Sequence, residues 1–202
     1  MSGSETATGF GSRNFPPQMT MVAHSGTSDP REVVLDLTYS SDHQEREILG
    51  CRDSGVFFDF EGGQVRFGPV AQSNEGDYRP PLLQVPLPLA AGRSYSGTSA
   101  VIASDGSTER TEAWNVTVDG PVTLNIAGRN TPTWQITTER HSLPGSSQTD
   151  NRTETYWFDP SRHFWVKFSE KQHGQQTVAG FTITYDNQLV ATLASFAPSH
   201  TS

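Results

Sequence analysis

Two pairs of carboxylic acids stand at a spacing that acid–base chemistry on a strand could use. Glu45 and Glu47 are two positions apart, as are Asp59 and Glu61. Side chains at this spacing point to the same face of a strand, and a pair of carboxyl groups performs the chemistry of most glycosidases. Solvated strand faces carry the same pattern. The pairs indicate a hydrolase or isomerase only if one carboxyl lies in a cleft with a raised pKa.

Other catalytic and metal-binding patterns are missing from the sequence. None of the six histidines has a second ligand at a recognised metal spacing, so we expect no metal and no cofactor. No G-x-S-x-G motif marks a serine nucleophile. The single cysteine, Cys51, has no histidine beside it and is interpreted as a buried or half-buried thiol. We therefore assign no catalytic residues and expect a binding protein rather than an enzyme.

The strongest candidate binding feature is aromatic. Residues 156–168 read YWFDPSRHFWVKF, which predicts an aromatic hairpin that turns at Asp159-Pro160. With a five-residue loop, Trp157 pairs with Trp165 on the face opposite the core. The core face then holds Tyr156, Phe158, Phe164, Val166 and Phe168.

Two outward tryptophans require an explanation, because large apolar groups seldom stay bare. Three interpretations are open. Another segment of the chain covers the two tryptophans, or they line a groove for an apolar or sugar ligand, or they form a protein contact surface. We take Trp157 and Trp165, with Trp134 on the strand expected at 133–141, as the candidate ligand-binding residues.

The elements that would position these residues are strands. The apolar fraction is only 33% of 202 residues, which suits strands with one face in water. Alternating patterns recur along the chain, and a helical period is absent apart from a short stretch near 42–47. We expect an all-β fold of roughly twelve antiparallel strands in an incomplete barrel or two curved sheets, with at most one short helix.

The expected organisation is a flexible arm at 1–17, one β-rich domain at 18–196 and a tail at 197–202. Dense proline at 79–92 excludes a central strand and predicts an extended connector between two sub-sheets. Glycine and polar residues predict turns, at 61–63, 119–121, 170–174 and 186–187.

Charge and hydropathy limit the kinds of molecule that this protein is expected to bind. The net charge is −8 and the basic residues are scattered, so we expect no nucleic-acid binding. No run reaches the roughly 18 apolar residues of a membrane span. The first thirty residues lack the apolar core of an export signal. We interpret the chain as the mature form of an extracellular or cell-envelope protein, or alternatively as a cytoplasmic one.

Several strings in the second half are similar to an uncharacterised, chiefly actinobacterial group of secreted proteins and lipoproteins. They are RPPLLQVPLPLAAGRSYSG, TPTWQITTER and ETYWFDPSRHFWVKFSE, and GSRNFPPQMTMVAHSG resembles the group's start after an export signal. The likeness covers most of residues 10–185. It implies curved antiparallel sheets, loosely similar to lipoprotein-carrier half-barrels, and it supplies no catalytic residues.

From these observations we expect a non-catalytic extracytoplasmic protein that binds an apolar or amphipathic ligand on a concave sheet face. The alternative is a structural or interaction module of the cell envelope, with an unidentified protein partner. An unfamiliar hydrolase or isomerase is the third hypothesis.

Overall fold

The computed structural model describes residues 1–26, 29–67, 70–146, 148–178 and 181–196. These residues form one antiparallel sheet of thirteen strands. The strands are β1 Ser2–Ala7, β2 Gly11–Asn14, β3 Thr20–Ser25, β4 Glu32–Ser40, β5 His43–Arg52, β6 Gly55–Phe67, β7 Val70–Pro86, β8 Ser94–Ile102, β9 Thr108–Ile126, β10 Arg129–Ser142, β11 Gln148–Asp159, β12 Phe164–Val178 and β13 Phe181–Thr192.

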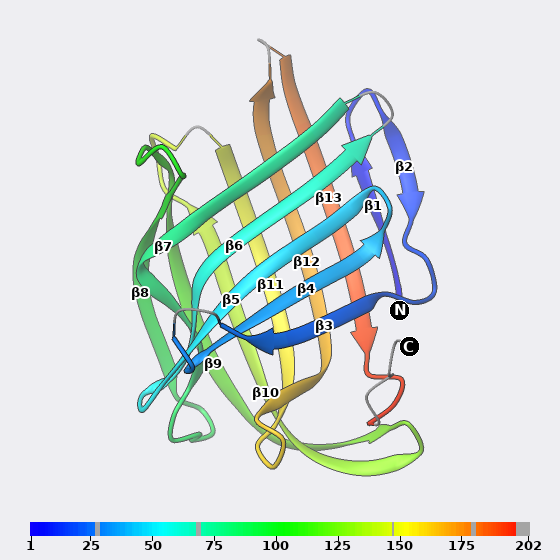
Figure 1. Ribbon diagram of the computed structural model, residues 1–202, viewed down its shortest axis with the longest axis vertical. Helices are drawn as coiled ribbons and strands as arrows, with labels where there is room; N and C mark the ends of the chain where they lie inside the picture. Colours follow the sequence, from blue (N-terminus) through cyan, green and yellow to red (C-terminus); the bar gives the residue numbers. More distant parts are fainter. Residues whose placement is uncertain (27–28, 68–69, 147, 179–180, 197–202) are drawn as a thin grey trace.

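The sheet curls into a half-barrel. Neighbouring strands follow chain order from β3 to β13, and β1 then pairs with β13 while β2 pairs with β1. Figure 1 shows β3 to β7 lying across β10 to β13, with β8 and β9 making the bend between the two layers. The all-β prediction is confirmed, and the incomplete barrel is the arrangement adopted.

Helices are not found among the described residues, so the stretch near 42–47 belongs to β5 instead of a helix. The same residues contain no helix that could cross a bilayer.

Apolar side chains fill one end of the space between the layers. Leu37 and Tyr39 of β4 pack with Tyr156, Phe168 and Leu189 from the opposite layer. Two further buried clusters continue this core: Leu35, Leu49, Phe58, Tyr78, Leu82 and Val101, and then Val85, Val116, Ile136 and Phe158. Alternation along each strand delivers these residues to one face, where their burial is the main favourable contribution to folding.

The expectation of a flexible arm at 1–17 is wrong. This segment contributes β1 and β2 to the sheet, and Glu5, Ala7 and Phe15 are buried. Phe15 joins the apolar cluster around Tyr39. Because β1 pairs with β13, the beginning of the chain completes the far side of the half-barrel.

The proline-rich stretch also differs from its prediction. Most of it lies in β7, where residues 82–86 pair with β6. β8 pairs with β7 only over Asp77–Arg79, so Pro80, Pro81 and Pro86 lie beyond that ladder. Proline is tolerated there because no backbone donor is needed on that side.

The four predicted turns are strand interiors, because β6, β9, β12 and β13 run straight through them. Gly62 is buried, and a Cβ there would lie 3.0 Å from ring atoms of Phe60. This glycine therefore makes room for an aromatic ring. Gly120 sits beside a β-bulge and has φ of 139°, a conformation that favours glycine.

The aromatic hairpin forms, but in another register. Phe158 pairs with Trp165 and Trp157 with Lys167, with a bulge between them. The predicted core face is right for Tyr156, Phe158, Val166 and Phe168, which are buried. The outward position predicted for Trp165 is wrong, because it packs against the apolar cluster around Tyr156 and Phe168.

Leu35 provides a direct test of the apolar core, since its side chain is completely buried. Leu35→Ala should lower the free energy of unfolding by about 2–5 kcal/mol, through lost apolar burial and the cavity left behind. Val22→Ala, on edge strand β3 and 51% exposed, should change it by less than about 0.5 kcal/mol. Urea unfolding of both variants measures the difference, and equal effects would contradict this description of the core.

Candidate functional site

Charged side chains fill the other end of the interior. Inward positions of β11 run from polar to apolar along the strand, in the order Gln148, Asp150, Arg152, Glu154, Tyr156 and Phe158. β9 repeats this order with Arg110, Glu112, Trp114, Val116 and Val118. The alternation of side chains along each strand therefore places ionisable groups on the same inward face as the apolar groups, a few residues away on the same strand.

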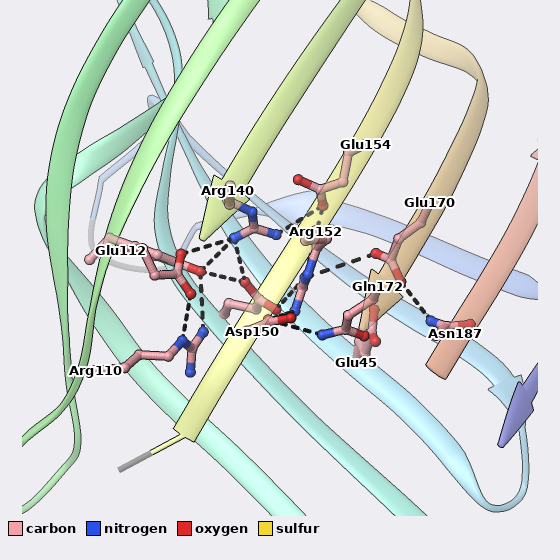
Figure 2. Close-up of polar contacts among 12 residues, drawn as sticks. Glu45, Arg110, Glu112, Arg140, Asp150, Arg152, Glu154, Glu170, Gln172 and Asn187 are labelled. Carbon is pink, nitrogen blue, oxygen red and sulfur yellow. Dashed lines mark hydrogen bonds and ion pairs between the residues drawn. The ribbon is translucent and has the colours of Figure 1, made fainter. Parts of the chain in front are cut away.

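Arg140 of β10 lies at the centre of the charged region. Its Nη1 donates to the Tyr78 hydroxyl at 2.7 Å and to Glu61 Oε2 at 3.1 Å. Its Nη2 donates to Glu154 Oε1 at 2.9 Å, and Glu112 Oε2 is 3.7 Å from Nη1. Figure 2 shows this guanidinium between Glu112 and Glu154. A buried cation so placed stabilises carboxylates from three other strands, together with Arg110 and Arg152.

Arg152 of β11 has a similar role. Its Nη1 donates to Glu61 Oε1 at 2.8 Å and its Nη2 to Asp150 Oδ2 at 3.2 Å. Glu170 Oε2 lies 3.9 Å from Nη1. Glu61 thus receives hydrogen bonds from both Arg140 and Arg152, which ties β6 in one layer to β10 and β11 in the other.

A second cluster of polar side chains connects the beginning of the chain to β5. His43 is 3% exposed and uses both ring nitrogens, Nδ1 with Glu5 Oε2 at 3.1 Å and Nε2 with Glu45 Oε1 at 2.9 Å. Tyr39 donates to the other oxygen of Glu45 at 3.0 Å. Arg13 binds Glu5 and also donates to the Arg66 carbonyl at 2.8 Å. We call Glu5, Arg13, His43 and Glu45 the clasp, because they connect β1 and β2 to β5 and β6 without a backbone ladder.

The environment shifts several pKa values. Burial alone would lower the pKa of His43, but hydrogen bonds and charge from Glu45 and Glu5 raise it to about 9. Burial raises the pKa of Glu47 well above its ordinary value, and the charges of Glu45 and Glu61 add to the effect. Burial likewise raises the pKa of Glu170, to about 8, against the opposing charge of Arg152.

The pKa of Glu61 is shifted in the opposite direction. Burial would raise the pKa of this carboxyl, but Arg152, Arg140 and Arg110 together hold it well below its ordinary value. Glu61 is therefore ionised, whereas a pKa of about 8 keeps Glu170 mainly protonated at pH 7.

A cavity of about 120 Å³ lies between the clasp and this network. Its charged wall is formed by Glu5, His43, Glu45, Glu61, Arg110 and Arg152. Three amides, Gln148, Gln172 and Asn187, form a second wall on β11 to β13. Ala7, Phe10, Val65 and Ile183 supply apolar surface, and Phe10 is 40% exposed. The cavity is thus lined by charged and amide groups together with apolar side chains, of which Phe10 is exposed.

One of the two predicted carboxylate pairs, Glu45 and Glu47, stays together in the structure, and the other, Asp59 and Glu61, separates. Glu45 and Glu61 line the cavity, and Glu47 interacts electrostatically with both. Asp59 instead binds Arg52, with both side chains partly exposed. A bulge between Phe58 and Phe60 separates the directions of Asp59 and Glu61.

The three candidate tryptophans lie in different places, and none is among the residues that line the cavity. Trp134 borders a shallow hollow with Pro121, Pro132 and Pro160. The Trp157 ring lies 4.2 Å from Lys167 Nζ, and Trp165 is partly buried against the apolar core. A role for these tryptophans in ligand binding stays a prediction.

Sequence reasoning missed most of the charged interior. Arg110, Arg140, Arg152, Glu154 and Glu170 were not identified, although a signal exists: they share strand parity with buried aromatic and aliphatic residues. Cys51, expected to be at least half-buried, is exposed. A cluster of three or more candidate metal ligands does not occur in the described ranges.

A scan against protein-family models matched none of them, and a search of curated proteins found no match. Among solved structures, the chain is similar to a hypothetical lipoprotein, YmcC, from Escherichia coli K12. The sequence identity is 12%, the TM-score is 0.38, and the alignment covers 95% of this chain and 86% of that chain. A likeness this distant carries no argument about activity, and the resemblance to the actinobacterial group stays a prediction.

Removal of Arg140 tests the buried network. Arg140→Met should lower the free energy of unfolding by roughly 3–5 kcal/mol, because Glu61 and Glu154 would remain buried without this cation. Arg46→Ala breaks the exposed pair with Asp36 and should cost less than about 1 kcal/mol. Chemical unfolding compares the two, and a loss at Arg140 no larger than at Arg46 would contradict a stabilising role for the network.

Stability should also depend on alkaline pH. The pKa of His43 is raised from 6.5 to about 9, so its stabilising charge is complete below pH 6.5 and lost as pH rises to 9. The raised pKa of Glu170 acts in the same direction over a lower range, from 4.5 to about 8, because there the folded protein keeps a proton that the unfolded chain has lost. The free energy of unfolding should therefore fall between pH 6.5 and 9, with His43 contributing at most roughly 3 kcal/mol.

His43→Gln should reduce that slope, whereas His173→Gln, at an exposed pair with Asp186, should leave it unchanged. Thermal unfolding between pH 6 and 9.5 measures all three proteins. A flat profile for the unmodified protein, or the same slope in the His43 variant, would be inconsistent with the clasp.

Proposed function

We propose that this protein is a non-catalytic, extracytoplasmic binding protein that holds a small amphipathic ligand at the charged end of the half-barrel. The observation that carries the proposal is the cavity between the clasp and the arginine network. Its interior offers charged and amide groups, and Phe10, Val65 and Ile183 offer apolar surface at the border. Binding pockets characteristically combine apolar walls with a few directed polar groups.

The size of the cavity restricts what can be enclosed. About 120 Å³ is below the roughly 300–1,000 Å³ of pockets that enclose a drug-sized ligand. A head group therefore enters the polar interior, and the remainder of the ligand lies toward Phe10. This arrangement supports an amphipathic ligand over a purely apolar one.

An extracytoplasmic location is supported by the resemblance of residues 10–185 to secreted proteins and lipoproteins. The interaction-module alternative rests on edge strand β3, which pairs only with β4 and exposes Val22. Concentration-dependent light scattering would show self-association if that edge were the functional surface.

A larger side chain at Gly63 would fill the cavity. It lines the space opposite Glu45, and a Cβ there would meet only ordinary contacts, with Glu45 Cγ at 3.5 Å and the Gln44 carbonyl oxygen at 3.8 Å. Gly63→Leu should therefore fold and occupy the ligand's volume. Gln64→Leu, at the next and exposed position, is the matched control.

Native mass spectrometry of protein purified from its own host should show a bound small molecule on the unmodified protein and on Gln64→Leu. The same mass should be absent from Gly63→Leu. Retention of that mass by folded Gly63→Leu, or its absence from all three proteins, would overturn the proposal.

A further inference from the structure

Each of the three amides of the cavity uses its nitrogen as a donor to another side chain. Gln148 Nε2 donates to the Tyr185 hydroxyl at 2.6 Å, Gln172 Nε2 to Asp150 Oδ2 at 3.0 Å, and Asn187 Nδ2 to Glu170 Oε1 at 2.6 Å. Figure 2 shows the nitrogens of Gln172 and Asn187 turned toward these carboxylates. Each of these nitrogens gives one of its two hydrogens to the protein, and the amide oxygens are left as acceptors.

These oxygens are short of donors. Asn187 Oδ1 is buried and has no hydrogen-bond partner within the described residues. Gln148 is 7% exposed and lines the cavity, yet no donor reaches its Oε1 in the part of the chain that the structure describes. A buried amide oxygen without a donor carries a desolvation cost, which a ligand donor would remove.

The sheet aligns these acceptors with a carboxylate. Gln172 lies opposite Asn187 in the β12–β13 ladder, and Asn187 lies opposite Glu5 in the β13–β1 ladder. Glu45 lines the cavity from the other layer. Acceptor groups therefore face the cavity from both layers of the half-barrel.

The two arginines that line the cavity are bound to carboxylates of the protein. Arg110 Nε binds Glu112, and Arg152 binds Glu61 and Asp150 through its terminal nitrogens, while Arg152 Nε is buried with no hydrogen-bond partner among the described residues. Around the cavity and the arginine network, eight carboxyl groups accompany five cationic groups: Glu5, Glu45, Glu47, Glu61, Glu112, Asp150, Glu154 and Glu170 with Arg13, His43, Arg110, Arg140 and Arg152. Two of the eight, Glu47 and Glu170, have raised pKa values. Carboxyl and amide oxygens therefore supply acceptors around the space left for a ligand.

A primary ammonium group matches this surface. It carries three donors, no acceptor and a positive charge. An alcohol has one donor and no charge, and a carboxylate has no donor. The rings of Phe10 and Tyr185 also line the cavity, and aromatic faces attract cations.

We infer that the head group bound in this cavity is a primary ammonium, carried on an apolar chain that leaves past Phe10. This inference rests on the proposed binding function and names the chemistry of its ligand. Glu45, Gln148 and Asn187 are the residues that would accept hydrogen bonds from the head group.

Three probes with one chain and different heads test the inference: n-hexylammonium, 1-hexanol and hexanoate. Isothermal titration calorimetry at pH 7 should show hexylammonium binding at least about tenfold more tightly than hexanol, with no hexanoate binding, since a charged hydrogen bond is worth roughly 1.5–3 kcal/mol. Glu45→Gln should weaken hexylammonium binding by about tenfold or more for the same reason. Glu139→Gln, at an exposed position of β10, should not change it.

Gln148→Met provides a second variant, in which one acceptor is lost and the clasp is left intact. It should also weaken hexylammonium binding while leaving hexanol binding unchanged. Equal binding of hexylammonium and hexanol, or tighter binding of hexanoate, would overturn the ammonium inference and leave the proposed binding function standing. Absence of binding by all three probes would also overturn the ammonium inference. The proposed binding function is then decided separately, by native mass spectrometry of the Gly63→Leu and Gln64→Leu variants.

Discussion

The ion pairs of Arg140 and Arg152 with buried carboxylates are the interaction on which the interior of this half-barrel depends. Taking a carboxylate out of water costs several kcal/mol unless a cation and hydrogen bonds replace the solvent. Glu61, Glu154 and Asp150 meet this requirement through the two arginines. Because these partners come from both layers, the network also fixes how the layers face one another. A slip of one residue in β11 would turn Arg152 to the outside and leave its carboxylates without a cation.

The two ends of the interior contribute differently to the structure. The apolar end, with Leu35, Ile136 and Val166 completely buried, supplies the burial that stabilises the sheet. The charged end holds the cavity, and it is also where the clasp connects β1 and β2 to β5 and β6. The edges β2 and β3 are not joined by a backbone ladder, so closure at this end relies on side chains. A ligand at the cavity would contact the same Glu5, His43 and Glu45 that provide the closure.

The strand-rich fold and the aromatic core could be predicted from the sequence, because residues such as Leu35, Leu37, Tyr156 and Phe158 alternate with polar ones. The charged interior could not be predicted by the same reasoning. Residues 170–174 and 186–187 are polar, and polarity on a strand ordinarily indicates solvent or a turn. In the structure Glu170 and Asn187 face inward, where Asn187 Nδ2 donates to Glu170 Oε1 and Arg152 Nη1 lies 3.9 Å from Glu170 Oε2.

Two further features depend on contacts that local patterns do not contain. Glu61 and Arg140 meet across 79 positions of the chain, so neither residue carries a nearby sign of its partner. The bulge between Trp157 and Phe158 changes the direction of Trp165, and a single inserted residue of this kind alters the facing of everything beyond it. The carboxylate pair at Asp59 and Glu61 is divided for the same reason.

The central claim is that the charged end of the half-barrel is a ligand site, and side-chain amide NMR tests it most directly. The NH₂ resonances of Gln148, Gln172 and Asn187 should shift together and saturably as n-hexylammonium is added. Those of Asn151 and Gln188, which are exposed on the outer face, should stay in place. Shifts at the outer amides with unchanged resonances at the three cavity amides would contradict the account.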